Sequence, residues 1–111
     1  MLFHHAFLRL AREELAASLA ADYGFTPADA KRQADLATDA QLQKTIADAR
    51  VKSDELLPAE CYDDSDGVMK ITLPDGHRIK KLKAWLDAHP NFKTALKAGL
   101  AILITLLISG T

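Results

Sequence analysis

The last fourteen residues of the sequence place the strongest constraint on how this chain can fold. Residues Ala98 to Thr111 carry no charge, and seven of the fourteen are Leu or Ile. As an α-helix this run is about 21 Å long, which by itself is shorter than the ~30 Å hydrocarbon core of a bilayer. Apolar surface of this kind is unfavourable in water. We therefore expect lipid or another protein to cover it.

The residues before this run favour lipid. A helix from Phe92 to Thr111 has twenty residues and reaches about 30 Å, and Lys93 and Lys97 can extend their ammonium groups to the headgroups. Apart from Thr105, the run from Leu100 to Ile108 has no polar stripe. We predict a membrane-anchoring unit made of Trp85, Phe92, Lys93, Lys97, Leu100, Ile102, Leu103, Ile104, Leu106, Leu107 and Ile108.

Charge is distributed unevenly along the chain. Residues 1–69 hold seven Lys or Arg against thirteen Asp or Glu, a net charge of −6. Residues 70–111 hold seven Lys or Arg against two Asp, a net charge of +5. Basic residues flank membrane spans on the cytoplasmic side. The sequence therefore predicts a single-pass protein whose N-terminal part is cytoplasmic.

A short basic helix is expected just before the anchor. Ile79, Leu82, Trp85 and Leu86 repeat at helical spacing over the segment from Ile79 to Ala88. Trp85 would lie at headgroup depth, and Pro90 would mark a bend into the span. The alternative is that Trp85 and Leu86 pack on the β-hairpin that is predicted for the residues before them. On the opposite side of this helix we expect a basic membrane-surface patch of Lys80, Lys81 and Lys83.

The N-terminal half has the pattern of helices. Apolar residues recur at helical spacing from Leu2 to Tyr23, and Gly24 is a typical residue just after a helix end. Thr26-Pro27 is a typical helix start. We expect this second helical stretch to run toward Lys52, with an interruption near Thr38. Its apolar face consists mostly of Ala, so it needs a partner helix.

The middle of the chain has loop and strand signals. Ser53-Asp54-Glu55 predicts one more helical turn before Pro58. Residues 58–67 have the composition of a loop. Val68 to Leu73 alternates apolar and polar residues, and the following Pro74-Asp75-Gly76 suits a tight turn. These features predict a β-hairpin with a short return strand near Ile79.

No combination of residues predicts catalysis, a cofactor or a metal. His4 and His5 are adjacent on a helix, so their side chains diverge and rarely bind one ion, and no third ligand accompanies them. The segment Asp63-Asp64-Ser65-Asp66 does not align with a calcium loop. Cys61 is the only cysteine, and its spacing to His77 or His89 supports no thiolate–imidazole pair. The basic stretch has few aromatic residues, so we do not expect a nucleic-acid partner.

The sequence thus predicts a mainly α protein in four parts. They are an acidic helical domain at 1–57, a loop and β-hairpin at 58–78, a basic interfacial helix at 79–90 and a C-terminal apolar anchor helix at 91–111.

The function expected for this arrangement is that of a non-enzymatic, C-terminally anchored membrane protein, a small subunit or adaptor of a membrane complex. Its expected partners are the bilayer and other protein subunits, including further copies of itself. The alternative is a small structural subunit of a virion or secretion-type machine. Its apolar C-terminal helix would then be buried between subunits or inserted into a membrane during delivery.

Overall fold

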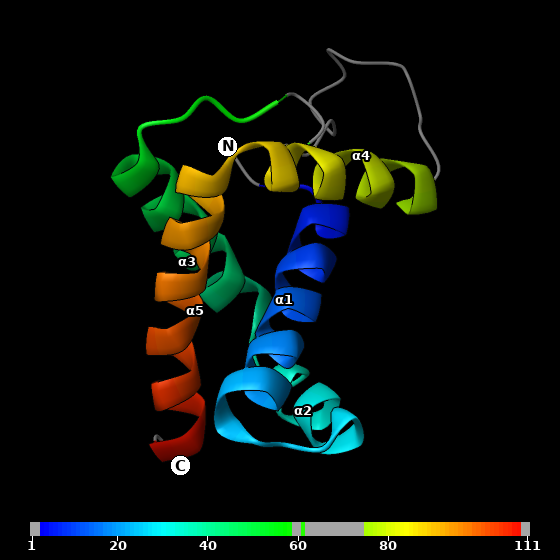
Figure 1. Cartoon of the computed structure of the whole chain (residues 1–111), viewed down its shortest axis with the longest axis vertical. Coiled ribbons are helices and arrows are strands. Elements are labelled where there is room, and N and C mark those ends of the chain that lie inside the picture. Colours follow the sequence, from blue (N-terminus) through cyan, green and yellow to red (C-terminus); the bar gives the residue numbers. More distant parts are fainter. Residues whose placement is uncertain (1–2, 59–60, 62–74, 110–111) are drawn as a thin grey trace.

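The computed structural model describes residues 3–58, 61 and 75–109 of the chain. The described part is mainly helical (Figure 1). Its five helices are α1 (His5–Tyr23), α2 (Pro27–Ala34), α3 (Asp39–Ser53), α4 (Asp75–Ala88) and α5 (Pro90–Ser109).

The helices pack as a small bundle with one helix lying across an end. Helices α1 and α5 both run away from α4, which lies across the end where each of them begins (Figure 1). Helix α2 packs on α1, and α3 packs on α5 and on α1. This arrangement makes α5 a neighbour of three other helices rather than a separate extension of the chain.

The core draws on all five helices. Helix α1 supplies the largest share, and α5 supplies a continuous buried face of its own. The almost fully buried side chains include Phe7, Leu10, Leu15 and Leu19 of α1, Ala30 and Ala34 of α2, Leu42 and Ile46 of α3, Leu82 and Leu86 of α4, and Phe92, Leu96, Leu100 and Ile104 of α5.

The end of α1 and the start of α2 confirm the sequence prediction. Helix α1 ends at Gly24, whose φ of 73° is left-handed, a conformation that glycine adopts without a steric penalty. Helix α2 begins at Pro27, and the Thr26 hydroxyl accepts a hydrogen bond from the Asp29 N–H at 3.2 Å. These ends follow from local chemistry, since a cap needs only neighbouring residues.

The predicted interruption near Thr38 is also confirmed, and a capping box causes it. The Thr38 hydroxyl accepts from the Gln41 N–H at 3.1 Å, and the Gln41 side chain accepts from the Thr38 N–H at 2.9 Å. Arg12 of α1 donates to the carbonyl of Ala37 at 2.8 Å. These bonds fix the start of α3 and tie it to α1.

Replacing Thr38 by alanine is expected to lower the free energy of unfolding by about 1 kcal/mol, because the N-cap acceptor is lost. Urea unfolding followed by circular dichroism measures this. Thr38→Ser is the matched control, since it keeps the hydroxyl and should lose much less. Equal losses in the two variants would contradict a capping role for the hydroxyl.

The predicted β-hairpin is wrong for every part of it that the structure describes. Residues 68–74 lie outside the described residues. The turn residues Asp75 and Gly76 and the expected return strand belong to α4 instead. The physical reason is burial, because Arg78, Leu82 and Leu86 follow one another at intervals of four residues and all three are buried. A helix puts them on one face, which a strand cannot do.

Two further boundaries differ from the expectation. The extra turn after Ser53 is absent, because Asp54 adopts a left-handed φ of 54° and ends α3 there. The bend near Pro90 is confirmed, since His89 is the single residue between α4 and α5. Helix α5 starts at Pro90 itself rather than at residue 91, as suits a proline at a first helical position.

Candidate membrane-anchoring helix

Helix α5 has two apolar faces, and the bundle covers only one. The buried face packs against α3 and α1 and consists of Phe92, Leu96, Leu100, Leu103 and Ile104. On the other face, Ile102, Leu106 and Ile108 are 59%, 55% and 47% exposed. No charged residue follows Lys97 on either face. An amphipathic helix of a soluble bundle normally turns a polar face to water, and α5 does not.

By length and composition α5 is able to cross a bilayer. It has twenty residues, and only 28% of its most suitable stretch is buried in the bundle. The two hydroxyls in the uncharged part of α5 after Lys97 are already satisfied inside the helix. Thr105 donates to the carbonyl of Ala101 at 3.1 Å, and Ser109 donates to the carbonyl of Thr105. Such bonds lower the cost of placing a hydroxyl in hydrocarbon.

Aromatic rings gather where α4 meets α5. Trp85 is half-buried and stacks on the ring of His89 with centroids 4.2 Å apart, and it meets Phe92 edge-on at 5.3 Å. The His89 Nδ1–H donates to the carbonyl of Trp85 at 2.7 Å. The Lys93 ammonium bonds the Asp87 carboxylate at 3.0 Å. Trp85 therefore packs on His89 and Phe92 in this structure. The alternative interpretation placed it on the β-hairpin, which is not formed among the described residues.

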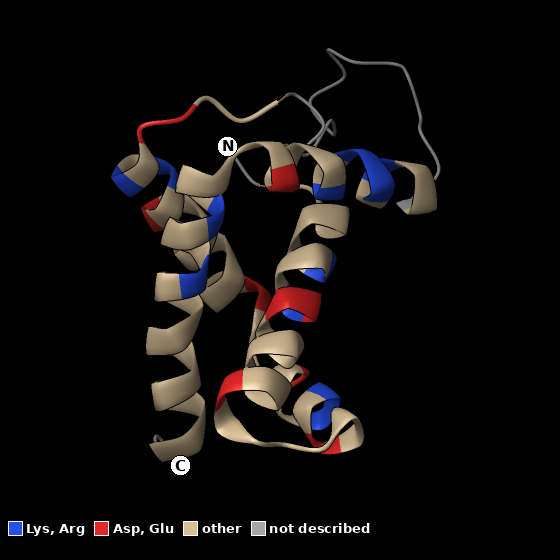
Figure 2. Ribbon diagram, in the orientation of Figure 1, with Lys and Arg blue, Asp and Glu red and all other residues tan. Residues whose placement is uncertain are grey.

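The predicted basic patch lies on the exposed surface of α4. Lys80, Lys81 and Lys83 are all exposed, and α4 crosses the end of the bundle at which α5 begins (Figure 2). Lys97 is exposed on α5, and Lys93 is partly covered. The lysines predicted to contact headgroups are therefore all on α4 or in the first turns of α5. The remaining half of α5 has none.

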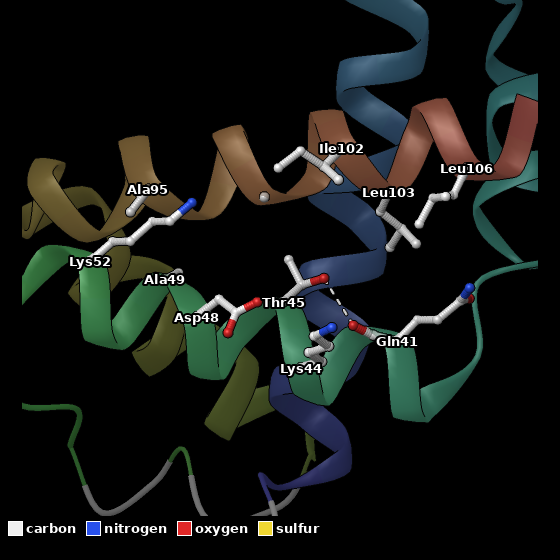
Figure 3. Close-up of a pocket in the computed structure, with 11 residues that line it drawn as sticks. Gln41, Lys44, Thr45, Asp48, Ala49, Lys52, Ala95, Ile102, Leu103 and Leu106 are labelled. Carbon is white, nitrogen blue, oxygen red and sulfur yellow. Dashed lines mark hydrogen bonds between the residues drawn. The ribbon is translucent and has the colours of Figure 1, made fainter.

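A groove of about 150 Å³ separates the exposed face of α5 from α3 (Figure 3). Its α5 wall is apolar and its α3 wall is mostly polar, so the two helices present different chemistry to the same space. The antiparallel pairing brings Lys52 near Ala95 at one end and Gln41 near Leu106 at the other (Figure 3). The lining residues are Gln41, Lys44, Thr45, Asp48, Ala49 and Lys52 of α3 with Ala95, Gly99, Ile102, Leu103 and Leu106 of α5.

Thr45 is a functional candidate that the sequence did not indicate. A Cβ placed on Gly99 would lie 3.0 Å from the Thr45 methyl carbon, so the absence of a side chain at Gly99 allows this close approach. The small residues Ala95 and Gly99, four positions apart, indicate that α5 can pair closely with another helix. Nothing local to residue 45 shows that α3 is that helix, because the pairing joins distant parts of the chain.

Of the residues considered as ligands or catalytic groups, His4 and His5 lie at the start of α1 and Cys61 lies in the core. The His4 Nδ1 accepts from the Ala6 N–H at 3.0 Å and so caps α1, while the adjacent His5 is exposed. Cys61 is buried, and its carbonyl accepts from the His4 N–H at 2.7 Å. Residues 63–66 lie outside the described residues. Within the described part of the chain, no group of three or more His, Cys, Asp or Glu side chains is placed to hold a metal ion.

Comparisons with protein-family models, with curated proteins and with solved structures find no match to this chain.

Proposed function

We propose that this chain is a non-enzymatic membrane-attached protein, a small subunit or adaptor of a membrane complex. Helix α5 is its single-pass anchor, and α1 to α4 form a cytoplasmic domain that binds other subunits. The observation that carries the proposal is the uncharged, exposed apolar face of α5 formed by Ile102, Leu106 and Ile108.

The energetics of α5 support insertion. Each of the three exposed side chains gains roughly 1 kcal/mol when its remaining exposed surface leaves water, which is about half of the value for burying a whole side chain. The five side chains on the buried face lose little, because lipid tails are about as apolar as the leucines they touch now. The cost of insertion therefore falls on the surfaces of α1 and α3 that α5 leaves.

The charges around α5 support the proposed orientation. Lys80, Lys81 and Lys83 on α4 with Lys93 and Lys97 on α5 lie before the uncharged run. Each lysine near an anionic membrane surface contributes about 1 kcal/mol of attraction. Basic residues on this side favour a cytoplasmic location for α1 to α4.

A second candidate function has its own supporting observation. Phe92, Leu100 and Ile104 of α5 are fully buried in the bundle, so in this structure α5 belongs to the folded domain. A subunit of a virion or secretion-type machine would keep α5 in place and cover the exposed stripe with a neighbouring copy. In that case lipid is not needed to cover α5.

Flotation of the purified full-length chain with vesicles of phosphatidylcholine and phosphatidylglycerol tests the proposal. We expect the chain to float with the vesicles and to resist carbonate extraction, because an inserted helix is not released by high pH. A chain that stays in the soluble fraction would rule out the anchor. Light scattering without lipid then tests the second candidate, which predicts a discrete multimer.

A further inference from the structure

We propose that α5 exchanges between two positions, packed on α3 as in this structure and inserted in the bilayer, and that the contact of Gly99 with Thr45 sets the balance between them. This inference rests on the proposed anchoring function, and it adds that packing of α5 on α3 regulates membrane attachment. A chain of this kind would be soluble when α5 is packed and membrane-bound when α5 is released.

The α3–α5 interface is held by packing alone. The hydrogen bonds and ion pairs of the described residues include none between α3 and α5. The Thr45 hydroxyl, which could have bonded across the interface, donates instead to the carbonyl of Gln41 at 2.8 Å within α3. Separation of the two helices therefore breaks no hydrogen bond or ion pair between them. The contacts that α5 loses are apolar, and lipid tails can replace apolar contacts.

The α3 wall of the groove already suits water. It is formed by Gln41, Lys44, Thr45, Asp48, Ala49 and Lys52, which are polar or small (Figure 3). Ile102 and Leu106 on the α5 side, by contrast, are already more than half exposed. Release therefore takes the apolar wall of the groove out of water and leaves the polar wall in it.

The junction between α4 and α5 can act as the hinge. His89 is the single residue between the helices, and Pro90 begins α5 without an N–H to lose. The His89 ring bonds the carbonyl of Trp85 in the last turn of α4. This carbonyl therefore has a hydrogen-bond partner that does not belong to α5. A change of backbone angles at His89 would therefore redirect α5 while α4 keeps its last turn.

The contact of Gly99 with Thr45 is a close one, and a substitution there should shift α5 between its two positions. A Cβ at residue 99 would lie 3.0 Å from the Thr45 methyl carbon, so a larger side chain at residue 45 pushes against the backbone of α5 unless it turns into the groove. Thr45→Leu overpacks the interface and leaves the sequence of α5 unchanged, so the intrinsic preference of α5 for lipid stays the same.

We expect Thr45→Leu to raise the partition of the full-length chain onto phosphatidylcholine and phosphatidylglycerol vesicles by about tenfold or more. Ala47→Leu, on the exposed side of α3, is the matched control and should partition as the unchanged chain does. If Thr45→Leu lowers stability in urea and leaves the partition unchanged, release of α5 does not limit membrane binding and the inference is wrong.

A reversible disulfide between α3 and α5 provides a second test, which does not depend on destabilising the bundle. Thr45→Cys with Gly99→Cys places two thiols at a close contact of α3 with α5, within the reach of a disulfide. We expect the oxidised chain to lose vesicle binding and the reduced chain to regain it. Equal binding of the oxidised and reduced forms would overturn the exchange and leave the anchoring proposal standing. Failure of the unchanged chain and of every variant to bind vesicles would instead overturn the anchor itself.

Discussion

Replacing Ile102 by lysine is expected to abolish membrane attachment and to leave the folded bundle almost unchanged. Residue 102 lies near the middle of the proposed span, where isoleucine contributes about −0.5 kcal/mol to insertion and lysine costs about 3 kcal/mol. The difference corresponds to a fall of roughly two to three orders of magnitude in partition. In the bundle the same side chain is 59% exposed, and substitutions at such positions change stability by about 0.5 kcal/mol or less.

The matched control is Val51→Lys, which places the same charge on α3. Val51 is 73% exposed and lies outside the proposed span. Vesicle flotation and urea unfolding should be measured on both variants. We expect Val51→Lys to bind vesicles as the unchanged chain does. Retained binding of Ile102→Lys would show that the chain attaches to membranes by its surface charge and that α5 is not the anchor.

Local chemistry made several elements predictable. Gly24 ends α1, Thr26 and Pro27 start α2, and Thr38 separates α2 from α3. Each of these boundaries depends on hydrogen bonds or backbone angles within about four residues, which a sequence displays directly. The apolar, membrane-length helix at the C-terminus was predictable for the same reason, because composition and length define it.

Non-local packing decided the features that the sequence did not predict. The alternation before Pro74 indicated a hairpin, but the burial of Arg78, Leu82 and Leu86 along one face belongs to a helix that packs on α1. A charged residue in that buried row could not be recognised from the sequence pattern. Thr45 was missed because its significance depends on Gly99, which lies on another helix. The half-burial of α5 likewise requires knowing where α1 and α3 run.

Replacing Phe7 by alanine is expected to lower the free energy of unfolding by about 3–5 kcal/mol, the cost of deleting a buried aromatic side chain. Phe7 of α1 is almost fully buried. Its ring packs edge-on against Phe3 with centroids 5.9 Å apart, and it lies tilted against the ring of Phe92 of α5 at 6.2 Å. For a small domain this loss is a large part of the total stability. Urea unfolding measures it, and Tyr23→Ala, at the exposed end of α1, is the control and should lose far less.

The same variant distinguishes the two proposed roles of α5. Removing the Phe7 ring weakens the packed position of Phe92 and changes nothing in α5 itself, so an exchanging α5 should partition more onto vesicles as the bundle loses stability. A structural subunit that keeps α5 in the bundle should instead become unstable or aggregate without gaining affinity for lipid. Flotation of Phe7→Ala beside Ile102→Lys therefore separates two contributions to membrane binding. Phe7→Ala alters only the stability of α5 in the bundle, and Ile102→Lys alters almost entirely the free energy of α5 in lipid.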